Sequence, residues 1–248
     1  MTMKDNSKAK AAAPTGVLCA MDIELADLLA SLEDPEVIEK AGYRFYEGTI
    51  GGSPIVLVKC GIGKVNAARG TQMLIDLFEP AAILNSGIAG GIGPGLHVGD
   101  IVIGTEFVQH DFDVTAFGHA KGFLCTDERD DEPTVFRADP EIVRRLRCAA
   151  EDLAAAGGRS VHEGRIASGD QFIASLEAKA EIAGLFGAVA AEMEGAAIAQ
   201  TAAYAGVPFA VLRVISDLGD GTAPESYETF EHEAADLSAA VICRYLER

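Results

Sequence analysis

The sequence predicts an α/β fold with helices on the faces of a mostly parallel sheet. Apolar runs of strand length alternate with helical segments of ten or more residues, from residue 15 to the end of the 248-residue chain. Hydrophobic residues make up 49% of the chain, which is ample for a buried core. No polar linker or internal repeat interrupts the alternation, so a single domain is expected.

The first half of the chain opens with a continuous apolar run, TGVLCAM at residues 15–21, which predicts a buried strand. The following segment, DIELADLLASLED, has apolar residues at helical spacing. A hairpin is expected next, because Gly51-Gly52 separates two strand-like runs. Three further elements are expected: a helix at 64–78, a buried strand at 81–86 that ends in the loop IAGGIGPGL, and a longer strand at 98–111.

The second half begins with a polar, acidic stretch at 119–138, which is expected to be a loop. Residues 140–157 predict a helix with Pro140 at its favoured first position. The remaining expected elements alternate: a strand at 161–170, a helix at 176–186, a short strand at 188–193, a helix at 195–206, a strand at 207–217 and a closing helix at 226–247.

Composition excludes several classes of protein. A net charge of −18 repels nucleic acid and anionic membranes. No apolar run approaches the roughly 20 residues that span a bilayer. The polar opening, MTMKDNSKAKAAAPT, lacks the apolar core of a secretory signal, so residues 1–14 are expected to be a disordered tail. Five scattered cysteines without CxxC spacing indicate reduced thiols in a cytoplasmic protein, and no histidine shows metal-ligand spacing.

Glycine or charged residues follow the expected strands at their carboxyl ends. Glu24 follows the first strand, and the later strands run into GIAGG, SGDQFI, EMEG and RVISD. In open α/β sheets ligands bind beyond these ends. The convergence of five such termini predicts a small-molecule site there.

Glu192 and Glu194 stand in a run of small apolar residues, AAEMEGAAIAQ, where unpaired carboxylates are costly. If they finish a strand, both side chains point to one face. A carboxylate at a strand tip can accept hydrogen bonds from two neighbouring hydroxyls, such as a ribose diol. The sequence leaves open that Glu194 only complements the dipole of the next helix.

Asp217 ends a long apolar strand, so burial is expected to raise its pKa and let it act as an acid. A turn aspartate after Ser216 is the alternative. Arg213 is expected to pair with a glutamate, for function or for structure. Glu24 either takes part in the site or complements a helix dipole. Phe172 offers either a stacking face for a base or a core side chain.

Eight motifs together resemble one family. GVLCAMDIE, KCGIGKVNAA, NSGIAGG, VGDIV, HDFDVTAFG, SGDQFI, AEMEGAAIA and VPFAVLRVISD occur in the order seen in 5'-methylthioadenosine/S-adenosylhomocysteine nucleosidases, of the nucleoside phosphorylase superfamily. The resemblance spans residues 15–245. It implies a single domain over 15–248, a three-layer α/β/α sandwich around a mixed, partly closed sheet, usually assembled as a homodimer.

The resemblance also implies a role for each matching residue. Glu24 is expected to activate the attacking water, and Asp217 to protonate N7 of adenine. The expected substrate contacts are Glu194 and Met193 at the ribose diol, Phe172 and Ile173 at the purine, and Met21, Ile62, Gly90, Arg213 and Ser216 elsewhere in the pocket. Val114 and Phe117 are expected to reach into the partner subunit's pocket for the 5' substituent. No metal or organic cofactor is implied.

Two positions depart from the family's pattern and leave the preferred 5' substituent undetermined. Ile88 stands where a serine is frequent, and His119 where a tyrosine is frequent. Adenosines with other 5' groups, such as aminodeoxyfutalosine, therefore stay open as substrates. A phosphorylase is disfavoured, because the arginine and serine of its phosphate site are replaced in NSGI. A nucleoside-binding protein without turnover is disfavoured, because binding alone needs no acid and base.

Overall fold

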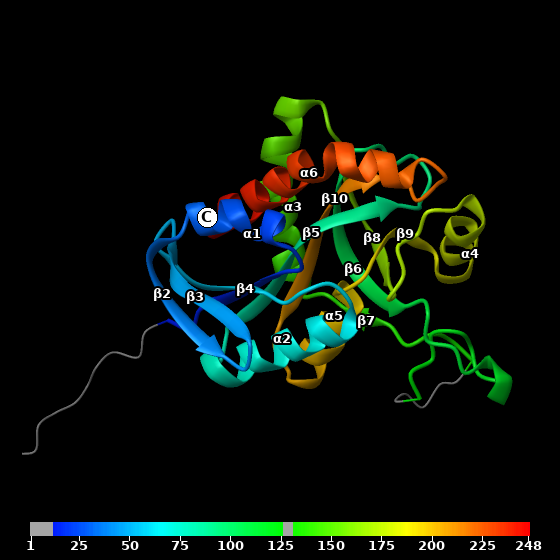
Figure 1. Cartoon of the computed structure of the whole chain (residues 1–248), viewed down its shortest axis with the longest axis horizontal. Helices are drawn as coiled ribbons and strands as arrows, with labels where there is room; N and C mark the ends of the chain where they lie inside the picture. Colours follow the sequence, from blue (N-terminus) through cyan, green and yellow to red (C-terminus); the bar gives the residue numbers. More distant parts are fainter. Residues whose placement is uncertain (1–11, 126–130) are drawn as a thin grey trace, which may run out of the picture.

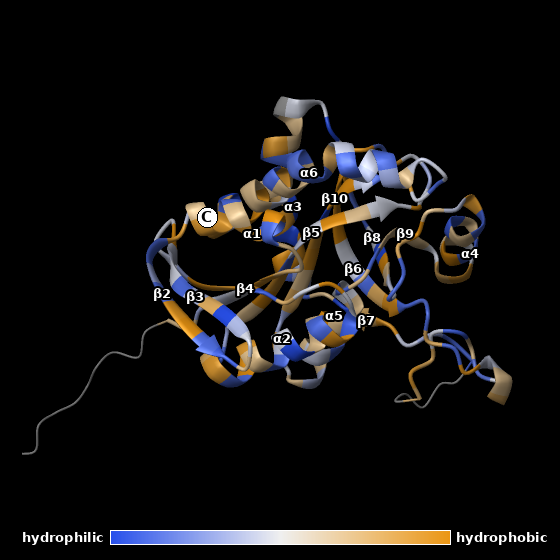
Figure 2. Ribbon diagram, in the orientation of Figure 1, coloured by the Kyte–Doolittle hydropathy of each residue, from blue (hydrophilic) through white to orange (hydrophobic). Residues whose placement is uncertain are grey.

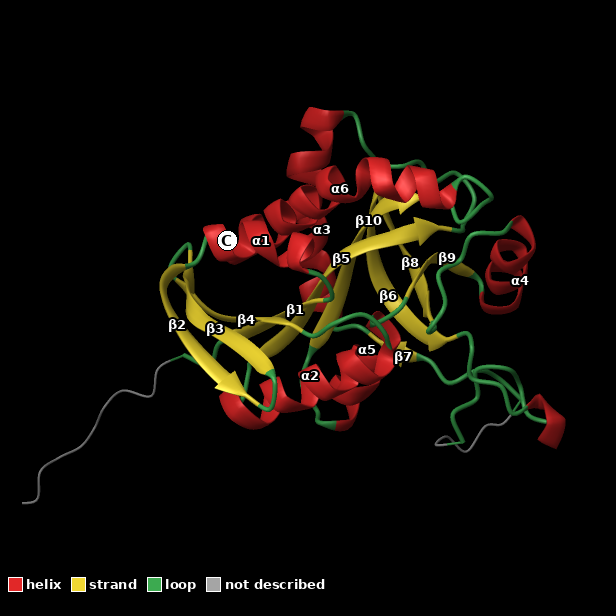
Figure 3. Ribbon diagram, viewed as in Figure 1, coloured by secondary structure: helices red, strands yellow, loops and turns green. Residues whose placement is uncertain are grey.

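The structure is a computed structural model that describes residues 12–125 and 131–248, so most of the tail predicted at 1–14 lies outside the described residues. A single sheet runs through the described part of the chain, with helices on both of its faces (Figures 1 and 3). Its strands are β1 (Thr15–Cys19), β2 (Glu33–Lys40), β3 (Tyr43–Ile50), β4 (Ser53–Lys59), β5 (Ala82–Gly91), β6 (Ile101–Gln109), β7 (Phe136–Arg137), β8 (Val161–Ser168), β9 (Ala188–Glu192) and β10 (Phe209–Asp217).

The helices form the two outer layers. They are α1 (Asp22–Ala30), α2 (Lys64–Phe78), α3 (Pro140–Gly157), α4 (Leu176–Phe186), α5 (Gly195–Tyr204) and α6 (Ala223–Leu246), with a 3₁₀ turn, η1, at Thr115–Phe117. Helices α1, α3 and α6 cover one face of the sheet, and α2 and α5 cover the other (Figure 1). None of the described helices is long and apolar enough to cross a membrane.

The sheet is mixed, so the expectation of a mostly parallel sheet was wrong. Strand β10 pairs parallel with β5 on one side and antiparallel with β6 on the other. Because β6, β8, β9 and β5 also pair in that order, these five strands close into a ring, from which β1, β4, β3 and β2 extend. The mixed, partly closed sheet and the three layers that the family resemblance implied are confirmed.

Side chains alternate between two cores, as the period of a strand requires. Val17 and Cys19 belong to the core under α1 and α6, whereas Leu18 belongs to the core under α2 and α5. Hydrophobic residues accordingly dominate the central strands, while the helices carry both kinds (Figure 2).

Several element boundaries differ from the expected ones. Strand β2 was missed, because all of its residues are exposed at the edge of the sheet and give no apolar face. The preceding helix ends at Ala30, ahead of Asp34 at φ 51° and of Pro35, which disfavours helix in the residue before it. Strand β5 continues through the expected loop to Gly91, because Gly90 and Gly91 pair with β9.

Other predictions are confirmed. Helices α2, α3 and α4 have the predicted bounds, and the hairpin turns between Ile50 and Ser53. Two of these helices begin at capping side chains: Asp139 accepts from the backbone N–H groups of Glu141 and Ile142, and Ser175 from that of Ala178. The predicted loop at 119–138 contains the short strand β7, and its residues 126–130 lie outside the described residues.

The core packing of α2 can be tested by truncating Leu74, which is fully buried where the helix crosses Gly16 of β1. We expect Leu74→Ala to lower the free energy of unfolding by about 2–5 kcal/mol, through lost burial and the cavity it leaves. The exposed Gln72 on the same helix provides the control, since Gln72→Ala should change the free energy of unfolding by no more than about 0.5 kcal/mol. Urea unfolding of the three proteins measures both effects, and equal losses would contradict the packing described.

Candidate active site

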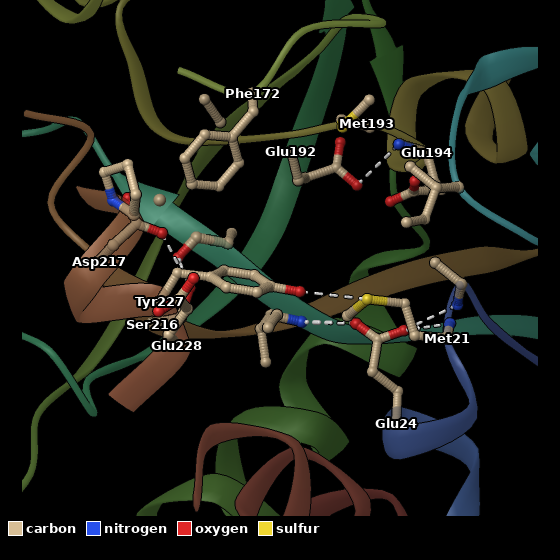
Figure 4. A pocket seen from close by; sticks show the side chains of 17 residues that line it. Met21, Glu24, Phe172, Glu192, Met193, Glu194, Ser216, Asp217, Tyr227 and Glu228 are labelled. Carbon is tan, nitrogen blue, oxygen red and sulfur yellow. Dashed lines mark hydrogen bonds between the residues drawn. The ribbon is translucent and has the colours of Figure 1, made fainter. Parts of the chain in front are cut away.

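A cavity of about 370 Å³ opens at the carboxyl ends of β1, β5, β9 and β10 (Figure 4). The sheet brings together strand ends that are far apart in the sequence, as predicted. The lining residues are Ala20, Met21, Glu24, Ile62, Ile88, Ala89, Gly90, Phe172, Ala191, Glu192, Met193, Glu194, Ser216, Asp217, Pro224, Tyr227 and Glu228. Glu24, Glu194 and Asp217 are therefore walls of one common cavity.

Glu24 lies in the first turn of α1 and is almost completely buried. Its carboxylate accepts hydrogen bonds from the backbone N–H groups of Ala20 (2.8 Å), Met21 (3.0 Å) and Ile88 (3.1 Å). Burial raises its pKa, against the opposing influence of Arg213 and of these three donors. The result is a fixed carboxylate with one edge facing the cavity, a geometry suited to a general base.

Gly87 of β5 makes the approach of Glu24 to the sheet possible. A Cβ at position 87 would lie 2.4 Å from Oε1 of Glu24 and 3.2 Å from Nη1 of Arg213. Gly87 is also the neighbour of Arg213 in the register of β5 and β10. The absence of a side chain there leaves room for both charged groups.

Glu192 and Glu194 reach the site by different routes, so the argument that both finish a strand was wrong. Strand β9 ends at Glu192, and Glu194 is the N-cap residue of α5. The side chain of Glu194 makes no capping bond, so it is not a conventional helix cap. Its Oε1 instead accepts from the backbone N–H of Gly63 (2.9 Å).

Arg213 joins these two carboxylates beneath the cavity floor. Its Nη2 donates to Glu192 and to Oδ1 of Asn85 (2.5 Å), and lies 3.7 Å from Oε2 of Glu194. Glu192 is also bound by the Ser168 hydroxyl and by the backbone N–H groups of Glu194 and Gly195. Glu192 is thus fully satisfied by the protein.

Glu194, in contrast, retains capacity to accept hydrogen bonds from a ligand. Burial raises its pKa, and the nearby charge of Glu192 raises it further. Hydroxyl donors from a ligand would favour the carboxylate form. Glu194 is therefore the member of the pair that can hold a diol.

Asp217 ends β10 and is almost completely buried at the opposite side of the cavity from Met21 (Figure 4). Its carboxyl accepts from the backbone N–H of Gly219 (2.8 Å) and from the Ser216 hydroxyl (2.9 Å). Burial raises its pKa more than these donors lower it. A carboxyl in this state can donate a proton to a ligand.

Other residues predicted for the site fall into three groups. Met21, Ile62, Gly90, Phe172, Met193 and Ser216 line the main cavity, and Ile173 lines a small annex of about 30 Å³ beside Phe172 and Asp217. Arg213 lies beneath the cavity and makes the structural ion pairs that were the alternative prediction for it. Val114 and Phe117 lie outside the cavity, in the segment around η1, where Phe117 is 81% exposed.

Sequence reasoning missed the cavity wall that α6 supplies. Pro224, Tyr227 and Glu228 line the cavity. The hydroxyl of Tyr227 lies 3.2 Å from Sδ of Met21, and its ring packs edge-on against Phe172. No signal in the sequence marks these residues, because they follow a turn and their direction is set by how α6 packs on the sheet. Among the described residues, no group of three His, Cys, Asp or Glu side chains is arranged to hold a metal ion.

Comparison with known proteins identifies the family. The model of the Phosphorylase superfamily matches residues 14–247. Two curated 5'-methylthioadenosine/S-adenosylhomocysteine nucleosidases are similar: that of an Exiguobacterium species is 42% identical, covering 94% of this chain and 97% of the relative, and that of Actinobacillus succinogenes is 45% identical, covering 92% and 95%.

Solved structures agree. The nucleosidase of the same description from Neisseria meningitidis, in complex with methylthio-immucillin-A, superposes with a TM-score of 0.88 at 39% identity, over 95% of this chain and 99% of that one. A futalosine hydrolase from Helicobacter pylori superposes with a TM-score of 0.83 at 33% identity, over 94% and 96%. The chain belongs to the phosphorylase superfamily and, within it, to the 5'-methylthioadenosine/S-adenosylhomocysteine nucleosidase family.

Proposed function

We propose that this protein hydrolyses the N-glycosidic bond of 5'-methylthioadenosine and S-adenosylhomocysteine and releases adenine. One observation carries the proposal: Glu24 in the first turn of α1, Glu194 at the start of α5 and Asp217 at the end of β10 line a single cavity with an aromatic ring, Phe172, at its wall. The names and bound ligand of the similar proteins support the choice of substrate.

Asp217 and Phe172 form the purine end of the proposed complex. The ring of Phe172 is half exposed and offers its face to a base, while the annex beside Ile173 accommodates the edge of the base. The proton on Asp217 passes to N7 of adenine. The electron pair of the C1'–N9 bond then leaves with a base that carries no net negative charge.

Glu194 and Glu24 act at the sugar. Glu194 accepts hydrogen bonds from the two hydroxyls of the ribose. Its negative charge stabilises the positive charge that develops on the ribose ring as the C1'–N9 bond breaks. Glu24 orients a water molecule, takes one of its protons, and the remaining hydroxide forms the new bond at C1'. Ile88 offers no hydroxyl beside Glu24, so its contribution is the backbone N–H that fixes the carboxylate.

The charges around the cavity favour water over phosphate as the nucleophile. Five of the described lining residues are acidic, namely Glu24, Glu192, Glu194, Asp217 and Glu228, and none is lysine or arginine. The buried Arg213 is already paired with Glu192. A phosphate dianion in this cavity would meet repulsion without a compensating cation.

The proposal includes a cytoplasmic homodimer. Val114 and Phe117 stand on a segment that extends away from the body of the subunit (Figure 1), and the exposed Phe117 is available to a second copy. In the dimer they would complete the pocket of the partner for the 5' substituent.

The main experiment measures adenine release from 5'-methylthioadenosine with and without inorganic phosphate. Hydrolysis predicts equal rates in both conditions and a free reducing sugar as the second product. A rate that depends on phosphate, with a sugar 1-phosphate as product, would identify a phosphorylase. Tight binding with no adenine released would identify a binding protein.

Replacement of the proposed acid tests the role of Asp217. We expect Asp217→Asn to lower kcat by about 10²–10⁴-fold, because an amide cannot supply the proton to N7. Asp76→Asn, at an exposed position of α2 outside the cavity lining, is the control and should keep near-normal activity. Adenine release by Asp217→Asn at the normal rate would exclude Asp217 as the acid.

The pH dependence of kcat/KM tests the ionisable groups of the site. Activity should fall at high pH, as Asp217 loses its proton, and at low pH, as Glu24 and Glu194 gain protons, because burial raises the pKa of both glutamates. The Ser216 hydroxyl stabilises the charged form of Asp217, so Ser216→Ala should raise the pKa of Asp217 further. The alkaline limb should then move to higher pH while the acid limb stays in place, and a shift to lower pH would contradict the assignment.

A further inference from the structure

The proposed function leaves Tyr227 of α6 without a role, although it forms part of the cavity wall. Three contacts hold its side chain, one of them between its hydroxyl and the carboxylate of Glu231. The ring packs edge-on against Phe172, with centroids 5.7 Å apart and an interplanar angle of 88°, and the hydroxyl lies 3.2 Å from Sδ of Met21. The hydroxyl therefore points along the cavity toward Met21 (Figure 4).

In this contact the tyrosine donates and the sulfur accepts, since a thioether has no hydrogen to give. Burial of the hydroxyl raises the pKa of Tyr227, and the charge of Glu231 one turn further along α6 raises it again. The hydroxyl thus keeps its proton in neutral solution. Tyr227 already binds a thioether in this structure, that of Met21.

The position of Tyr227 matches the 5' end of the proposed substrate. In the proposed complex Asp217 binds the purine and Glu194 binds the ribose diol. The 5' carbon of the ribose then faces the remaining part of the cavity, which neither the purine nor the diol occupies. Met21 lies at the side of the cavity away from Asp217, with the Tyr227 ring between them (Figure 4). A group attached at the 5' carbon meets Met21 and the Tyr227 hydroxyl there.

We infer that Tyr227 is a specificity-determining residue that recognises sulfur at the 5' position, by donating to the substrate the hydrogen bond that Met21 accepts in this structure. The inference rests on the proposed function and adds to it the residue that distinguishes a 5' group joined through sulfur from one joined through carbon. A substrate joined through carbon has no acceptor for this hydroxyl.

The test compares 5'-methylthioadenosine with its carbon isostere, in which CH₂ replaces sulfur. The wild-type protein should prefer the sulfur compound in kcat/KM. Tyr227→Phe keeps the ring and removes the hydroxyl, so it should reduce that preference by about 2- to 10-fold, as expected for one neutral hydrogen bond. The loss should fall on the sulfur compound alone. Tyr245→Phe, on the same helix and outside the cavity, should leave both substrates unchanged.

Three results would overturn the inference. An equal loss for both substrates in Tyr227→Phe would show that the hydroxyl only supports the fold, and no loss would show that it recognises nothing. Met21→Leu keeps the Tyr227 hydroxyl, so this variant should keep the preference for the sulfur compound. If Met21→Leu abolishes the preference and Tyr227→Phe retains it, Met21 is the group that recognises sulfur. If wild-type protein releases adenine from neither substrate, the proposed function itself fails.

Discussion

The buried guanidinium of Arg213 is the charge on which the rest of the site depends. It lies inside the sheet on β10, paired with Glu192 and within 3.7 Å of Glu194. Carboxylates held out of water without such a partner lose their charge. Losing one member of a buried ion pair typically costs about 3–5 kcal/mol. Because Glu192 takes most of the interaction with Arg213, Glu194 is held in place while part of its hydrogen-bonding capacity remains open to a ligand.

Two carboxyls of the cavity are set for opposite tasks by different surroundings. Burial raises the pKa of both Glu24 and Asp217. Glu24, however, has three backbone N–H donors and lies in the field of Arg213, all of which favour its charged form. Asp217 has one backbone donor and one hydroxyl, while the more distant charge of Asp220 raises its pKa and that of Lys179 lowers it. This asymmetry suits Glu24 to act as a base and Asp217 as an acid in the same cavity.

The fold and most of the cavity could be predicted from the sequence, where periodicity and strand ends carry the information. Helix α3 and strand β10 follow directly from their apolar patterns, and the strand-end rule placed Glu24 and Asp217 in one cavity. Strand β2 could not be predicted, since an edge strand exposed along its whole length has no apolar face. The convergence of Glu192 and Glu194 was predicted for the wrong reason, because a turn at Met193 and not strand alternation brings them to Arg213. The position of Tyr227 in the cavity wall could not be predicted either, because it is set by how α6 packs on the sheet and not by any local pattern in the sequence.

The closed ring of strands has a consequence for how the chain is synthesised. Strand β10, close to the end of the chain, lies between β5 and β6, which precede it by roughly a hundred residues. Until residues 209–217 have left the ribosome, β5 and β6 each carry an open edge with unpaired backbone groups. The ring is therefore completed late, through contacts of long sequence separation that form slowly. Strand β10 also carries Arg213 and Asp217. The active site therefore cannot form until β10 has paired with β5 and β6.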